Sequence, residues 1–111
     1  MTNGNRKGKS GERELSKELT RLFGEPCRRG QQYCGGTDSP DVVGLPGIHI
    51  ESKRTEKLLL WQAIDQAVAD AGDNVPVVCH RRNHQPWVAI VRLDDLPALA
   101  TNLYLILAGK N

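Results

Sequence analysis

Two acidic residues and a lysine lie close together in the middle of the sequence, on either side of a tight turn. Asp41 follows Pro40, and the segment Glu51-Ser52-Lys53 comes shortly after it, with Leu45-Pro46-Gly47 between them. Leu-Pro-Gly lets a chain reverse between two strands, so a β-hairpin here would bring Asp41 next to Glu51. Two carboxylates beside an ammonium can support metal-assisted cleavage of a phosphodiester bond. The spacing therefore predicts a nuclease.

Alternating apolar and polar residues place the second carboxylate on a strand. From Ile48 to Lys53 the pattern has the period of two that is typical of a half-buried strand. Ile48, Ile50 and Ser52 would share one face, while His49, Glu51 and Lys53 would share the other. The Val-Val pair that follows Asp41 predicts the partner strand.

The residue types at this hairpin favour a hard divalent cation. Mg²⁺ prefers oxygen ligands and usually keeps several waters, so Asp41, Glu51 and the backbone carbonyl of Ser52 would leave room for phosphate and water. Such a cation activates water and offsets charge on the phosphoryl oxygens, and Lys53 would add electrostatic stabilisation. The alternative is that Glu51 and Lys53 form a solvated strand face and that Asp41 is a turn residue.

A helix from about Ser10 to Gly24 would support this hairpin, with Ser10 as its N-cap. The helix buries a stripe of Leu15, Leu19, Leu22 and Phe23. At about 100° per residue, Glu12 falls in the middle of this stripe, whereas Glu14 and Glu18 lie on the far side. A carboxylate aimed at the core needs a partner, which favours a role for Glu12 in the site. The alternative is a first-turn acid that interacts favourably with the helix dipole.

Length and composition limit the class of protein. The chain has 111 residues, of which 39% are hydrophobic and 25% charged, as expected for one globular domain. No apolar run approaches a membrane span and no signal peptide is recognisable, so we expect a cytoplasmic protein without a membrane partner. Three cysteines without close pairing indicate neither a disulfide framework nor a zinc site. Cys79 to His84 is better explained as a basic turn than as a metal motif.

Basic residues are grouped in several short segments although the net charge is only +2. Such clusters bind phosphate backbones largely through counterion release, which favours a nucleic-acid partner. A solvated surface is the alternative for any one cluster. The clusters give Arg6, Lys7, Lys9, Arg28, Arg29 and Arg54 as candidate DNA-binding residues.

The predicted order of elements is αβββαββα, in an α/β fold. Residues 1–9 would form a flexible basic arm, and residues 10–111 a single domain. We expect helices over 10–24, 57–71 and from Asp94 or Asp95 to 108, and strands over 27–33, 41–44, 48–54, 75–79 and 87–92.

These motifs resemble the PD-(D/E)xK nuclease superfamily, and within it the archaeal-type Holliday-junction resolvases and small phage relatives. The resemblance spans about residues 6 to 92. The segments that carry it are Lys7-Gly8 leading to Glu12-Arg13-Glu14-Leu15, Arg28-Arg29, Pro40-Asp41-Val42-Val43 and Glu51-Ser52-Lys53-Arg54. It implies a restriction-endonuclease-like core, with a central mixed sheet flanked by helices.

The resemblance also implies roles for individual residues, among them phosphate contacts for Arg13, Arg28 or Arg29. Glu12, Asp41, Glu51 and Lys53 would be catalytic, with Asp41, Glu51 and the Ser52 carbonyl on the metal and Glu12 joining them through a water. Mg²⁺ would be the cofactor, with Mn²⁺ able to substitute. Hydroxyl side chains before the aspartate and amide side chains on the second helix would have supporting roles. The alternative for the amides is that they form a solvated helix face. These supporting residues are Thr37, Ser39, Gln62 and Gln66.

The expected activity is Mg²⁺-dependent endonucleolytic hydrolysis of DNA, most naturally of branched or four-way DNA by a homodimer that makes two symmetric cuts. The last helix offers either a dimer surface or a cover for the sheet, through Leu99, Leu103, Tyr104, Ile106 and Leu107. Recombination, repair and phage DNA metabolism in a bacterial, archaeal or phage-infected cell all fit. The alternatives are a nuclease for flaps, single strands or duplex ends, and a non-catalytic DNA-binding protein with the same fold.

Overall fold

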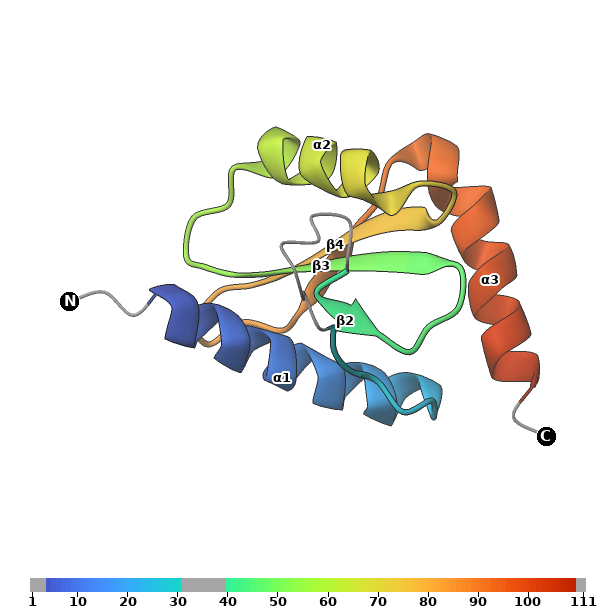
Figure 1. The fold of residues 1–111 in the computed structure, drawn as a ribbon, viewed down its shortest axis with the longest axis horizontal. Coiled ribbons are helices and arrows are strands. Elements are labelled where there is room, and N and C mark those ends of the chain that lie inside the picture. The colour runs from blue at the N-terminus through green and yellow to red at the C-terminus, as the bar shows by residue number, and fades with distance from the viewer. Residues whose placement is uncertain (1–3, 31–39, 110–111) are drawn as a thin grey trace.

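A five-stranded mixed sheet with helices against both faces forms the centre of the molecule (Figure 1). The computed structural model describes residues 4–30 and 40–109, with side chains from residue 8 onwards. The elements in chain order are α1 (Gly4–Phe23), β1 (Arg28–Arg29), β2 (Val42–Val43), β3 (Ile48–Arg54), α2 (Leu60–Ala71), β4 (Val75–Arg81), β5 (Val88–Ile90), the 3₁₀ turn η2 (Leu93–Asp95) and α3 (Leu96–Ala108). The predicted order αβββαββα and the α/β class with a mixed sheet are confirmed.

The strands lie side by side in sequence order, from β1 to β5. Only β3 and β4 are parallel; the other three pairs are antiparallel. A parallel pair needs a long crossover connection, and α2 supplies it. This crossover places α2 over the central strands, on the sheet face opposite α1 (Figure 1).

Each face of the sheet is covered by its own hydrophobic core. On the α1 face, Leu15 and Leu19 pack against Ile48 and Ile50, and Ile106 of α3 joins this core. On the α2 face the smaller core consists of Ala63, Ile64, Ala67 and Val78. The predicted alternation in β3 is present, but the first four residues of this strand are all buried because helices cover both faces. The strand is therefore more enclosed than a half-buried hairpin strand.

Helix α1 begins at Gly4, not at Ser10 as the cap pattern predicted. Residues 5–9 contain no proline, so basic and small residues continue the helix backwards at modest cost. The predicted end is right, since Gly24 has a φ of 70° and donates its N–H to the Thr20 carbonyl at 2.9 Å. Residues 4–9, assigned to an arm, are thus helical, and whether they are mobile stays a prediction.

Other predicted boundaries shift by a few residues. Helix α2 starts at Leu60 instead of residue 57, because the Thr55 hydroxyl donates to the Lys57 carbonyl and residues 55–59 form a connection. Asp95 precedes α3, but it accepts a hydrogen bond from Arg92 at 2.8 Å and does not cap the helix with its side chain. The predicted strand over 27–33 is described only at Arg28–Arg29, because residues 31–39 lie outside the described residues.

Helix α3 both covers the sheet and presents apolar side chains to solvent. Leu99 and Leu103 pack against the core that contains Ile106, while Tyr104 and Leu107 are exposed. One side of the helix therefore covers the sheet, as one interpretation predicted, and the other side presents the apolar surface that the dimer interpretation requires.

Within the described residues, none of the helices has the length and apolar character needed to cross a membrane. Cys27 and Cys79 are free thiols, and Cys34 lies outside the described residues.

Candidate functional site

Asp41 and Glu51 meet across the β2–β3 pair. The register pairs Val42 with Ile50, so Asp41 lies at the end of β2 opposite Glu51. Their carboxyl groups share a hydrogen bond, and Asp41 Oδ2 also accepts one from the Ser52 backbone N–H at 2.8 Å. The hairpin geometry expected from the sequence thus brings the two carboxyl groups into contact.

Burial dominates the electrostatics of this pair. The pKa of Asp41 is raised to about 6, chiefly by burial and also by the neighbouring Glu51, while the Ser52 N–H and Lys53 lower it. The pKa of Glu51 is also raised, chiefly by burial, although the hydrogen bond from Asp41 and the charge of Lys53 lower it. Both shifts disfavour the charged forms, and a cation bound at the pair would offset this cost.

Lys53 lies on the same face of β3 as Glu51, as the alternation predicted. Its charge lowers the pKa of both carboxyl groups, and its Nζ donates to Gln66 Oε1 on α2 at 3.4 Å. Gln62, one turn before Gln66, lines a cavity of about 250 Å³ together with Lys53. Both predicted glutamines therefore lie beside the lysine.

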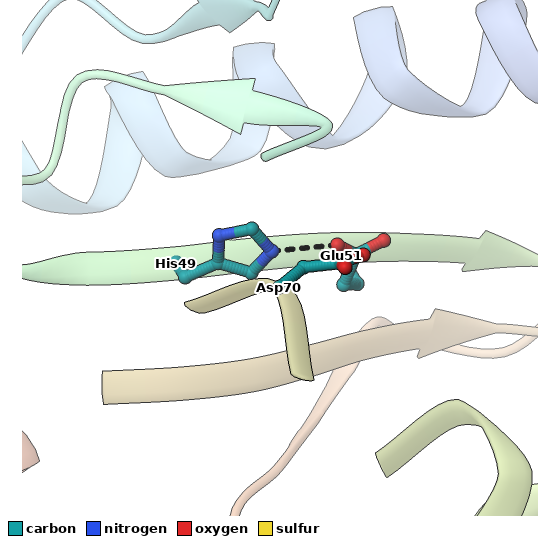
Figure 2. Close-up of side chains that lie close together, drawn as sticks. All are labelled: His49, Glu51 and Asp70. Carbon is teal, nitrogen blue, oxygen red and sulfur yellow. Dashed lines mark hydrogen bonds and ion pairs between the residues drawn. The ribbon is translucent and has the colours of Figure 1, made fainter. Parts of the chain in front are cut away.

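His49 and Asp70 complete the cluster around Glu51, as Figure 2 shows. His49 Nε2 is 2.6 Å from Glu51 Oε2, and ligand atoms of His49, Glu51 and Asp70 all lie within 4.8 Å of one another. Sequence reasoning missed His49 and Asp70. Two signals were present: His49 precedes Glu51 by two residues on its strand face, and Asp70 follows Gln66 by one helical turn.

Glu12 approaches from the opposite face of the sheet. It is half-buried on α1, where its carboxylate pairs with Arg29 Nε of β1 at 2.9 Å. A core-facing carboxylate was expected to need a partner, and Arg29 is that partner. The charge of Glu12 raises the pKa of Glu51, so Glu12 acts electrostatically on the Asp41–Glu51 pair.

Arg54 and Arg29, two of the candidate DNA-binding residues, are engaged within the protein. Arg54 Nε pairs with Glu14 Oε1 at 3.3 Å, and the same oxygen accepts from Arg81 Nη1 at 2.6 Å. Glu14 was predicted to lie on the far side of α1, which is wrong, because the side chains of Arg54 and Arg81, at the ends of β3 and β4, both reach its carboxylate.

Three further candidates, Lys9, Arg13 and Arg28, have exposed side chains. The side chains of Arg6 and Lys7, together with Thr37 and Ser39, lie outside the described residues.

The sequence matches no family model and no curated protein. Among solved structures, the chain is similar to Hjc, a Holliday junction resolvase from the archaeal hyperthermophile Archaeoglobus fulgidus. The TM-score is 0.56 at 26% sequence identity, and the match covers 77% of this chain and 72% of that one. The chain therefore has a resolvase-like nuclease fold, consistent with the PD-(D/E)xK superfamily that its motifs resemble.

Proposed function

We propose that this protein is a metal-dependent endodeoxyribonuclease that acts on branched DNA. The observation that carries the proposal is the contact between the Asp41 and Glu51 carboxyl groups beside Lys53. This contact occurs on a fold similar to that of a Holliday junction resolvase. Because one fold can serve several functions, the argument depends on these side chains more than on the fold.

The donor atoms at this pair fit Mg²⁺. Asp41, Glu51 and the Ser52 carbonyl offer only oxygen, which is the ligand type that Mg²⁺ prefers, and Mn²⁺ accepts the same donors. Glu12, held by Arg29, would reach the ion through a water. When bound, the cation lowers the pKa of water and offsets charge on the phosphoryl oxygens.

Lys53 would stabilise the charge that develops on the phosphate during in-line attack by water. Its ammonium is already beside both carboxyl groups, and Gln66 restrains its position. Hydrolysis would leave 5′-phosphate and 3′-hydroxyl ends, as expected for this superfamily.

DNA would be held mainly through its phosphates. Lys9, Arg13 and Arg28 are exposed, and Arg6 and Lys7 precede them on the N-terminal segment of α1. Contacts of this kind give affinity without sequence preference, and they weaken with salt.

A homodimer would place two such sites on one four-way junction. The exposed apolar side of α3, formed by Tyr104, Leu105 and Leu107, offers a surface for this contact. We expect light scattering to give a dimer for the wild type and a monomer for Tyr104→Glu with Leu107→Lys. A monomeric wild type at concentrations well above those used for cleavage would contradict the two-site arrangement.

A cleavage panel tests the proposed activity. Matched four-way, flap, single-stranded and linear DNA substrates would be incubated with and without Mg²⁺, using wild type, Lys53→Ala and Lys57→Ala. Lys57 is an exposed lysine of the same cavity and serves as the control. We expect Mg²⁺-dependent cutting that is fastest on the four-way substrate, severe loss in Lys53→Ala with DNA affinity kept, and near wild-type rates in Lys57→Ala.

Full activity of Lys53→Ala would refute the role of the lysine. Faster cutting of flaps or single strands would instead identify a nuclease of another DNA structure. DNA binding without cutting, together with no heat of Mg²⁺ or Mn²⁺ binding, would identify a non-catalytic DNA-binding protein.

A further inference from the structure

The side chains on the other side of Glu51 form a second group of potential metal ligands. His49, Glu51 and Asp70 each offer one ligand atom, and these atoms lie within 4.8 Å of one another. Two ligand atoms of one ion with bonds of about 2.1 Å lie roughly 3 to 4 Å apart. The three side chains can therefore surround one ion after a small adjustment of the 2.6 Å His49–Glu51 contact.

Two of the three potential ligands are buried, and Asp70 is partly buried. His49 is 1% exposed and Glu51 is 4% exposed, and both project from the α2 face of β3. Helix α2 brings Asp70 over them, and Figure 2 shows its carboxylate beside that of Glu51. The position of these ligands is set by the strand and the helix, not by a loop.

Charge around Asp70 is unbalanced in the described part of the chain. Among residues 8–30 and 40–109, Asp70 makes no ion pair or hydrogen bond, and it lies next to the like-charged Glu51. Glu51 is buried and Asp70 is partly buried, so a cation between the two carboxylates would relieve their mutual repulsion. The charges of Glu51 and Asp70 are therefore compatible with the ligand geometry of a cation site.

The donor set differs from that of the Asp41–Glu51 pair because it includes an imidazole nitrogen. Imidazole nitrogen is a ligand of zinc and other transition metals, whereas Mg²⁺ prefers an all-oxygen shell. Three protein ligands with room for a further ligand are typical of catalytic zinc sites. The group should therefore discriminate against Mg²⁺.

We infer that His49, Glu51 and Asp70 bind a divalent transition-metal ion of the zinc class, adjacent to the proposed Mg²⁺ position. The inference builds on the proposed function, because Glu51 would be shared by the two positions. Paired metal positions a few ångströms apart are common in enzymes that cleave phosphodiesters.

Binding of Co²⁺ and Zn²⁺ to the metal-free protein tests the inference without relying on activity. Co²⁺ is followed by its visible absorption and Zn²⁺ by calorimetry, in wild type, His49→Asn, Asp70→Asn and Asp65→Asn. Asp65 is an exposed acid of the same helix and serves as the control. We expect binding in wild type and Asp65→Asn, and an affinity at least roughly tenfold lower in His49→Asn and Asp70→Asn.

Two outcomes would overturn the site: no Co²⁺ or Zn²⁺ binding by the wild type, or unchanged affinity and spectrum in a folded Asp70→Asn. Circular dichroism identifies folded variants, and Asp70→Asn covers the case in which replacing the buried His49 prevents folding. Asp41→Asn separates this inference from the proposed function, since it should lose Mg²⁺-dependent cleavage and keep the Co²⁺ spectrum. Cleavage retained by Asp41→Asn would instead count against the proposed function alone.

Discussion

Lys53 on β3 donates a hydrogen bond from Nζ to Gln66 Oε1 on α2, across 3.4 Å. This contact joins the strand that carries Glu51 to the helix that carries Asp70, and it restrains an ammonium that acts on both Asp41 and Glu51. The crossover helix is therefore part of the candidate site as well as a cover for the sheet.

Replacing Gln66 with alanine should lower the cleavage rate while leaving DNA affinity unchanged. The lysine would lose its restraint and sample more orientations, which we expect to cost roughly three- to tenfold in single-turnover rate. Gln62→Ala is the control, because Gln62 lines the same cavity one turn away. Equal rates for the two variants would show that the contact does not position Lys53.

A methyl group at Gly11 should destabilise the fold. A Cβ there would lie 2.6 Å from Arg54 Cβ, so α1 or β3 would have to move, at a cost of about 1–3 kcal/mol. At Gly8 in the same helix a Cβ meets nothing within 4 Å, and alanine should add roughly 0.5–1 kcal/mol of helix stability. Urea unfolding of Gly11→Ala and Gly8→Ala measures both effects, and a loss of similar size in both variants would contradict the close approach at Gly11.

Asp41→Asn should make the metal-free protein more stable at neutral pH. The native pKa of Asp41 is about 6 against an ordinary value of 3.8, so between these values the native state binds the proton more tightly than the unfolded state. Stability of the wild type therefore falls as pH rises through this window, and the loss persists above it. An asparagine carries no charge and avoids this loss. The unfolding free energy of the variant should therefore be about 1–3 kcal/mol higher than that of the wild type.

The check is the difference in unfolding free energy between Asp41→Asn and wild type, in chelator, at pH 4 and pH 7.5. We expect a gain at pH 7.5 and little difference at pH 4. Adding Mg²⁺ should reduce the gain, because the ion stabilises the wild type preferentially. A gain of the same size at both pH values would show that the burial of the Asp41 charge is not its cause.

Arg54 and Arg28 should respond differently to alanine, although both were predicted to bind DNA. Arg54 pairs with Glu14, so Arg54→Ala should reduce stability by about 1–3 kcal/mol because Glu14 loses a partner. Arg28 is exposed, so Arg28→Ala should change stability by less than about 0.5 kcal/mol and reduce the salt dependence of DNA affinity by about one unit of slope. Thermal unfolding and salt titrations of binding measure these effects, and a stable Arg54→Ala with a reduced salt slope would assign Arg54 to DNA instead.

The central hairpin shows which features local sequence patterns can predict. Alternation over Ile48–Arg54 predicted the bounds of β3 and the face shared by Glu51 and Lys53. The position of the turn predicted that Asp41 would meet Glu51. These features were accessible because strand periodicity and hairpin register depend on residues close together in the sequence.

The contacts between distant elements were decided only by the tertiary structure. The approach of α2 to β3 places Asp70 beside His49 and Glu51, and the packing of α1 on β3 brings Glu14 within reach of Arg54 and Arg81. Residues 19 or more positions apart meet here through helix packing, whose offset and rotation no local pattern specifies. The amino-acid sequence by itself thus determined the carboxylate pair and its lysine, while the packing of α1 and α2 decided which further charges surround them.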